Sequence, residues 1–256
     1  MLSLAYSLKW LIDQVNQDRS IKFLYFWGHT NKHNEAVGKF CFSQWFEMPF
    51  SVDGVLYKTA EHWMMANKAL LFEDFKSWKK IVNAHKPGEV KELGRNVLGF
   101  DEIVWRQNRY EIVVKGNIHK FNQHPTYAEY LLQTGDRILV EASPVDKIWG
   151  IGLSQDNEYA DTPELWEGEN LLGFALMEVR DFLKQYGHFD IVKAPTDLPW
   201  KLFPEKHTAD MFWRMGTGEE ICRAFWTFYS GLPVRDKIIF RLTNPEPFSW
   251  KQAYTA

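Results

Sequence analysis

Two charged side chains, Glu61 and Lys68, lie in a stretch of strongly helical sequence that begins after Thr59. Thr59 is a suitable N-cap, and Glu61 then falls in the first helical turn, where the positive end of the helix dipole favours an ionised carboxylate. Lys68 follows seven residues later, on about the same face two turns on. A carboxylate and an amine on one face flanked by aromatic side chains are polar groups that call for a functional explanation. The alternative is a solvated pair on an ordinary amphipathic helix.

A second candidate carboxylate, Asp146, follows a run at 137–143 that reads as a strand. Loops after strand ends commonly carry functional groups, and Pro144 and Gly150 would hold this loop in a defined shape. Two carboxylates beside aromatic side chains suit cleavage of a glycosidic bond, because negative charge stabilises an oxocarbenium-like transition state while a second carboxylate activates water. The alternative is that Asp146 only caps its own backbone.

Other chemistries lack their motifs. The chain has no phosphate-binding loop of the Gly-x-x-x-x-Gly-Lys-Ser/Thr type and no Gly-x-Ser-x-Gly nucleophile elbow. Trp149-Gly150-Ile-Gly152 lacks the third glycine of a dinucleotide-binding turn. The eight histidines show no metal-ligand spacing, and His29 and His33 lie in a polar loop. We therefore expect neither a metal nor a cofactor.

Composition limits the class of protein and its partners. A chain of 256 residues with net charge −3 lacks the basic excess of a general nucleic-acid-binding surface. Two distant cysteines provide no disulfide framework, which fits a reducing compartment. The N-terminal apolar run is a poor signal peptide, and no apolar run is long enough to span a bilayer. The expectation is a soluble, cytoplasmic protein without a membrane partner. Aromatic residues make up 16% of the chain, and 12 of them are Trp. Most must be packing residues, but a surplus of Trp is also what a binding pocket for a flat ring would use.

The fold class indicated is mainly α with a few short β-strands, too few for a doubly wound sheet. Apolar residues between 101 and 124 recur at three- and four-residue steps, which predicts a long helix with Asp101 as its cap. Asp53-Gly54 between apolar residues predicts a hairpin over 50–57. Further helices are expected at 1–18, 60–72, 75–84, 87–94, 126–133, 170–186 and 218–229, and further strands at 21–26, 137–143 and 237–242.

Seven segments together resemble one known family. They occur in the order Phe42-Ser43-Gln44-Trp45, Ala60-Glu61-His62-Trp63, Lys68-Ala69, Gly94-Arg95, Trp105, Asp146-Lys-Ile-Trp149-Gly150 and Asn170-Leu-Leu-Gly173-Phe-Ala-Leu-Met177. In order and spacing they resemble the signature of the NADAR (YbiA-like) family over about residues 21–186. The resemblance implies a single compact domain at 1–187. Residues 188–256 would be a C-terminal extension of unknown role, joined by a Pro-rich segment.

The same resemblance implies roles for particular residues. Glu61 and Asp146 would be the catalytic pair. The implied substrate-binding residues are Ser43, Trp45, His62, Lys68, Arg95, Trp105, Trp149, Gly150 and Asn170. Four of these have structural alternatives: Trp105 and Trp149 as core residues, His62 as a packing residue and Asn170 as a helix cap.

Family members are similar in being N-glycosidases without a cofactor, which leaves three functions open. The first is hydrolysis of a phosphorylated ribosyl-amine of the ribosylaminouracil phosphate type found in riboflavin synthesis. The alternative is removal of ADP-ribose from guanine, with ADP-ribosylated DNA as partner in a toxin–antitoxin or defence system. The third is a non-catalytic module that binds NAD or ADP-ribose. The leaving base and the oligomeric state are not specified by the sequence.

Overall fold

The computed structural model describes residues 5–17, 20–31, 34–194 and 197–250. The chain forms two compact units. The larger comprises Met1–Ser51 and Val55–His188, and the smaller comprises Val52–Gly54 and Phe189–Ala256. Each unit is described by itself. Among the described residues, no helix has the length and apolar character needed to cross a membrane.

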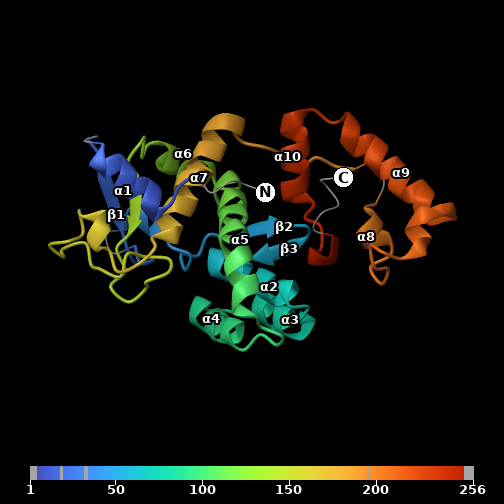
Figure 1. Cartoon of the computed structure of the whole chain (residues 1–256), viewed down its shortest axis with the longest axis horizontal. Coiled ribbons are helices and arrows are strands. Elements are labelled where there is room, and N and C mark those ends of the chain that lie inside the picture. The colour runs from blue at the N-terminus through green and yellow to red at the C-terminus, as the bar shows by residue number, and fades with distance from the viewer. Residues whose placement is uncertain (1–4, 18–19, 32–33, 195–196, 251–256) are drawn as a thin grey trace. The chain divides into compact units, whose positions relative to one another are not determined.

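Three helices build the core of the larger unit. The long helix α5 (Glu102–Asn122) packs against α2 (Ala60–Leu71) on one side and α7 (Leu171–Tyr186) on the other (Figure 1). Trp63 of α2 donates from Nε1 to the carbonyl of Ile112 at 2.7 Å. Gly116 makes this approach possible, because a Cβ there would lie 2.2 Å from the Trp63 ring. The predicted caps are confirmed: Thr59 accepts from the His62 amide, and Asp101 from the Val104 amide.

Two short sheets complete the larger unit. β1 (Phe23–Phe26) pairs in parallel with β4 (Ile138–Glu141), so that Phe26 lies opposite Glu141. β4 also packs on α7, which buries it on both sides. The predicted hairpin is present as β2 (Phe50–Val52) and β3 (Val55–Tyr57). Its turn residues Asp53 and Gly54 have φ angles of 51° and 77°, the geometry that favours an Asp-Gly turn.

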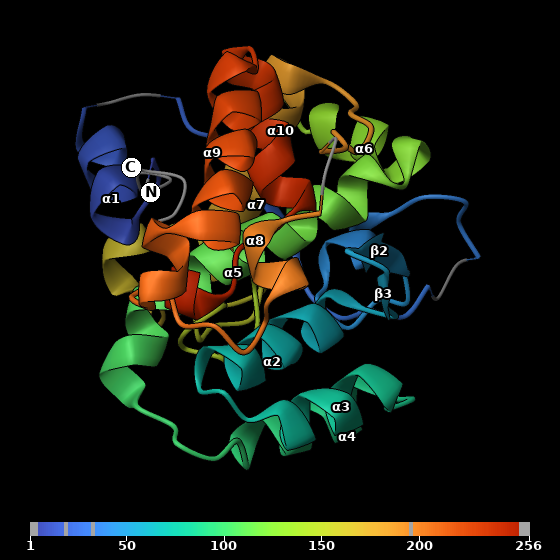
Figure 2. The same cartoon turned by 90° about the vertical axis from the view of Figure 1, so that its right-hand side faces the viewer.

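Helices α3 (Phe75–Asn83) and α4 (Pro87–Arg95) lie beside α2 (Figure 2). Gly94 sets the separation of α4 from α2, since a Cβ at this position would lie 2.0 Å from the sulfur of Met65. The remaining elements of this unit are α1 (Leu8–Asn16), the 3₁₀ turns η1 (Lys39–Phe42) and η2 (Pro163–Leu165), and α6 (Pro125–Leu132). The helix predicted over 1–18 is shorter than expected, and residues 1–4 and 18 lie outside the described part of the chain.

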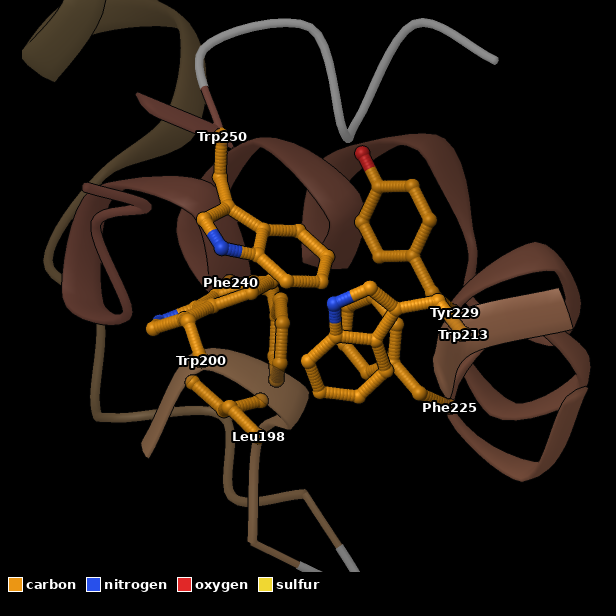
Figure 3. Packing of buried hydrophobic residues seen from close by; sticks show 7 residues of the cluster. All are labelled: Leu198, Trp200, Trp213, Phe225, Tyr229, Phe240 and Trp250. Atoms are coloured by element: carbon orange, nitrogen blue, oxygen red, sulfur yellow. The ribbon is translucent and has the colours of Figure 1, made fainter. Parts of the chain in front are cut away.

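The smaller unit has an aromatic core of its own. Its elements are α8 (Pro199–Leu202), η3 (Met211–Arg214), α9 (Gly216–Gly231), α10 (Val234–Thr243) and η4 (Phe248–Trp250). Seven buried side chains meet in one cluster (Figure 3): Leu198, Trp200, Trp213, Phe225, Tyr229, Phe240 and Trp250. The ring pairs in this cluster include edge-to-face, tilted and stacked arrangements, and Trp200 and Phe225 are edge to face with centroids 5.5 Å apart.

One sequence-based expectation for this unit was wrong. Residues 237–242 form part of helix α10 rather than a strand, because Ile239, Phe240 and Leu242 are buried on a helical face and this packing overrides their β-propensity. The Pro-rich segment that was expected to join the two parts of the chain also contains a helix. Pro199 opens the short helix α8, which places Trp200 in the aromatic core.

Candidate active site

Glu61 is a buried carboxyl group in the first turn of α2. Its exposed fraction is 4%. Burial is the main cause that raises its pKa to about 7, and the negative charge of Asp146 contributes to that rise. The charge of Lys91 and a hydrogen bond from the Trp45 side chain oppose this rise in the pKa without cancelling it. Near neutral pH, Glu61 is therefore able both to hold and to release a proton.

Residues 41–44, which precede Trp45, are held in place by hydrogen bonds to α2 and α5. The Glu61 amide donates to the carbonyl of Gln44 at 3.0 Å. The Gln44 side-chain amide pairs in both directions with that of Asn117 on α5. The fully buried amine of Lys120 donates to the carbonyls of Cys41 at 2.7 Å and Ser43 at 3.0 Å. Helix α5 thus holds the segment that carries Trp45 over the start of α2.

Asp146 lies on the loop that follows β4 and is partly exposed. Its Oδ1 accepts hydrogen bonds from the amides of Ile148 at 2.9 Å and Trp149 at 2.8 Å. The capping alternative is therefore real, yet the charge of Asp146 also reaches Glu61. Gly150 is required by space, because a Cβ there would lie 2.8 Å from the Glu141 carbonyl and 3.0 Å from that of Asp146. Capping and charge are two uses of one carboxylate.

Glu141 is a third carboxyl group, which the sequence analysis missed. It is the last residue of β4, and burial followed by the charge of Asp146 raises its pKa to about 8. Its Oε2 is buried and has no hydrogen-bond partner within the part of the chain that the structure describes. A charged residue ending the apolar run Ile-Leu-Val was the available signal. Glu61, Asp146 and Glu141 form one electrostatically coupled group, which we call the carboxyl cluster.

Asn170 helps to position Glu141 of the carboxyl cluster through a hydrogen bond to its backbone amide. It is fully buried, directly before α7, in the left-handed region with φ 53°. Its side chain does not cap the helix. Instead Oδ1 accepts from the Glu141 amide at 3.0 Å, and Nδ2 donates to the carbonyl of Leu139 at 3.0 Å. The side-chain amide of Asn170 thus joins the start of α7 to the end of β4, and its contact with substrate stays a prediction.

Loss of the two side-chain hydrogen bonds of Asn170 should weaken both the fold and the site. Asn170→Gly keeps the left-handed backbone but leaves two buried backbone groups unpaired, at an expected cost of about 2 kcal/mol. Asn170→Ala should cost about 1 kcal/mol more, because a residue with a Cβ strains this conformation. Urea denaturation measures both. Equal stability of Asn170→Gly and wild type would show that the two bonds contribute nothing.

Lys68 lies beside the ring of Trp105 and does not pair with Glu61. The Lys68 amine donates to the Gly94 carbonyl at 2.9 Å and lies 4.0 Å from the Phe100 ring centroid and 5.5 Å from that of Trp105. Burial lowers the pKa of Lys68, and Glu102 partly opposes this. Lys68 is not among the charges that shift Glu61. The pairing of Glu61 with Lys68 is therefore not formed, and Lys68 joins α2 to the end of α4.

The other predicted binding residues divide by exposure. His62 is fully buried and contacts the Thr59 hydroxyl at 2.8 Å and the Ala84 carbonyl at 3.3 Å, which supports its packing alternative. Arg95 is exposed and pairs with Glu92 at 3.3 Å on the surface of α4. Ser43 accepts from the Trp45 amide at 3.2 Å. Ser43 therefore lies beside Trp45, whereas His62 and Arg95 make side-chain contacts with other residues.

Lys91 is a second residue that the sequence analysis missed. It is exposed on α4, its amine lies 5.8 Å from the centroid of the Trp45 ring, and its charge favours ionised Glu61. A lysine on an exposed helical face carries no signal in a single sequence. Within the described ranges, no group of three histidine, cysteine or acidic side chains has the arrangement of a metal site, and this covers the carboxyl cluster.

Comparison with known proteins places this geometry in context. Residues 25–184 match the model of the NADAR domain. The chain is 44% identical over 165 residues to "N-glycosidase R617" of Acanthamoeba polyphaga mimivirus, an alignment that covers 62% of this chain and 95% of the relative. It is 29% identical over 143 residues to "Riboflavin biosynthesis protein VVA0006" of Vibrio vulnificus, covering 56% of this chain and 35% of that protein.

A solved structure is also similar. The NMR structure of the Escherichia coli protein YbiA aligns with a TM-score of 0.51 and 25% identity, covering 66% of this chain and 92% of the other. All the residues of the carboxyl cluster, together with Trp45, fall inside the segment 25–184.

Proposed function

Because this chain belongs to the NADAR family, we propose that it is an N-glycosidase that hydrolyses the bond between a phosphorylated ribose and an amine nitrogen. Relatives named N-glycosidase support the reaction class. The observation that carries the proposal for this chain is the carboxyl cluster itself. Glu61 and Glu141 have pKa values raised to about 7 and about 8, and the charge of Asp146 contributes to both shifts.

The environments of Glu61 and Asp146 favour different roles. Glu61 is buried and, with its pKa raised to about 7, is partly protonated near neutral pH, so a proton is available for general acid catalysis. Asp146 is partly exposed and accepts two amide hydrogen bonds, which suits an ionised carboxylate. We assign proton donation to Glu61. We assign charge stabilisation and activation of water to Asp146.

The reaction then balances as a hydrolysis. The bond between the anomeric carbon and nitrogen breaks as Glu61 gives its proton to the departing nitrogen, and the electron pair of the bond leaves with the amine. Positive charge on the sugar is stabilised by Asp146. Water adds to the anomeric carbon and loses a proton to Asp146, which yields free ribose phosphate. Asp146 then releases its proton to solvent, and Glu61 takes up a proton from solvent, which restores the starting state of both groups. Trp45, whose side chain hydrogen-bonds to Glu61, provides aromatic surface beside that carboxyl group.

The substrate class we favour is a ribosylaminouracil phosphate, as in riboflavin synthesis. A relative named as a riboflavin biosynthesis protein supports this choice. The net charge of −3 counts against a nucleic-acid strand as the usual substrate, since such strands are bound through many phosphate contacts.

A substrate panel tests the proposal. The full chain is incubated separately with ribosylaminouracil phosphates, ADP-ribosylated guanosine and ADP-ribosylated DNA, and free ribose phosphate or ADP-ribose is measured by chromatography. We expect ribose phosphate from the first substrate. Release of ADP-ribose alone would replace the substrate class and keep the reaction. Turnover of none, together with calorimetric binding of ADP-ribose, would contradict an enzymatic function.

A further inference from the structure

A cavity of about 300 Å³ is lined in part by Trp45 and by none of the three residues of the carboxyl cluster. Its walls come from the loop after β1, the segment before β2, the start of α2 and the start of α4. The lining residues are His29, Trp45, Phe46, Glu47, Lys58, Thr59, His85, Lys86 and Pro87. Apart from Trp45 and the capping residue Thr59, none of them has been given a role so far. A space of this size is at the lower end of the range for small-molecule sites.

The cavity presents more basic than acidic groups. Two lysines and two histidines line it against the single carboxyl group of Glu47. Lys58 is held in place, because its amine donates to the Ala84 carbonyl at 2.7 Å and lies 3.2 Å from Nδ1 of His85. An ammonium group only donates, so Nδ1 accepts, and the His85 proton then sits on Nε2. The remaining N–H groups of the Lys58 amine and the Nε2–H of His85 are therefore able to donate hydrogen bonds to an anion.

The cavity and the carboxyl cluster share one aromatic ring. Trp45 lines the cavity, and its side chain also hydrogen-bonds to Glu61. The amine of Lys91 lies 5.8 Å from the same ring centroid and acts on Glu61. A ligand that lies along Trp45 would thus meet a proton donor at one end and basic groups at the other. A sugar phosphate has this polarity, with its reacting carbon and its dianion at opposite ends.

We propose that this cavity is the phosphate subsite of the enzyme and binds the phosphate monoester of a pentose phosphate through Lys58, Lys86 and His85. The inference rests on the function proposed above and deepens it. Amines and imidazole N–H groups are suitable donors to a phosphate dianion. The small volume favours a sugar monophosphate over a dinucleotide. His29 and Trp45, with ring centroids 5.7 Å apart, form the aromatic side of the subsite.

Lys86 is the best residue to test, because it is exposed and its replacement leaves the hydrogen bond from the Lys58 amine to the Ala84 carbonyl in place. Lys86→Gln should raise KM for a phosphorylated ribosylaminouracil by about tenfold, the loss of one charged contact, with kcat nearly unchanged. Lys86→Glu should raise KM further. Neither variant should change KM for the dephosphorylated substrate. Lys9→Gln, an exposed lysine of α1 outside the cavity, is the matched control.

Binding separates this inference from the proposed function. Phosphorus NMR titration of the full chain with ribose 5-phosphate should show saturable binding that Lys86→Glu weakens and Lys9→Gln does not, and ribose should not compete. This result would support the subsite even if no ribosylamine is hydrolysed. Unchanged binding of ribose 5-phosphate to Lys86→Glu would overturn the subsite. So would equal increases in KM for the phosphorylated and dephosphorylated substrates, while hydrolysis itself would stand.

Discussion

Glu61→Gln is expected to lower the rate of hydrolysis strongly while making the stability of the fold less dependent on pH. The amide cannot give up a proton, and loss of general acid catalysis lowers kcat by about 10²- to 10⁴-fold. The side chain has nearly the same shape, and its oxygen can still accept from Trp45. Activity is measured as release of ribose phosphate. Glu129→Gln, at an exposed position on α6, serves as the matched control and should behave as wild type in both respects.

The stability effect follows from the raised pKa of Glu61. The folded chain holds this proton up to about pH 7, whereas the unfolded chain releases it near 4.5. The stabilisation from this proton is therefore complete below pH 4.5 and is lost as pH rises through 7. Between pH 5 and pH 8 the loss is on the order of 2 kcal/mol for wild type and absent in Glu61→Gln. Parallel pH dependences of the unfolding free energy would contradict a buried, proton-holding Glu61.

Asp146→Asn should reduce kcat by about 10²-fold or more with little change in stability. The asparagine oxygen can still accept from the amides of Ile148 and Trp149, so the loop keeps its shape while the negative charge is removed. The pKa of Glu61 should fall, because the charge of Asp146 helps to raise it. The descending limb of the pH–rate profile should therefore move to lower pH.

Asp146→Ala distinguishes the two uses of this carboxylate. It removes both amide hydrogen bonds and should lower the free energy of unfolding by about 1 to 2 kcal/mol in addition to the loss of activity. If Asp146→Asn keeps nearly full activity and only Asp146→Ala is impaired, the residue is a loop cap and the catalytic assignment is wrong.

Local signals in the sequence predicted most helices, their caps and the hairpin. They did not predict which elements pack against one another. Thr59 and Asp101 were identified as caps because a cap depends on residues three apart. The hairpin followed from Asp53-Gly54 alone. The tail residues 237–242 were misread because their β-propensity is local, whereas the aromatic core that holds them in α10 is assembled from segments far apart in sequence.

The site residues that belong to a sequence motif could be predicted. The environments that depend on tertiary packing could not. Glu61 and Asp146 follow from the family pattern, and the structure couples their charges. Lys68 was placed with Glu61 by helical phase, but seven residues of helix separate them by about 10 Å along the axis. The depth of burial of His62 and Asn170, and the unpartnered oxygen of Glu141, depend on long-range contacts that spacing does not reveal.

The pH dependence of kcat/KM for a phosphorylated ribosylamine, corrected for spontaneous hydrolysis, tests the central assignment most directly. A protonated Glu61 with a pKa raised to about 7 predicts a rate that falls above neutral pH, and a residual rate in Glu61→Gln that lacks this limb. A rate that stays constant or rises up to pH 9 would show that the buried carboxyl group is not the proton donor.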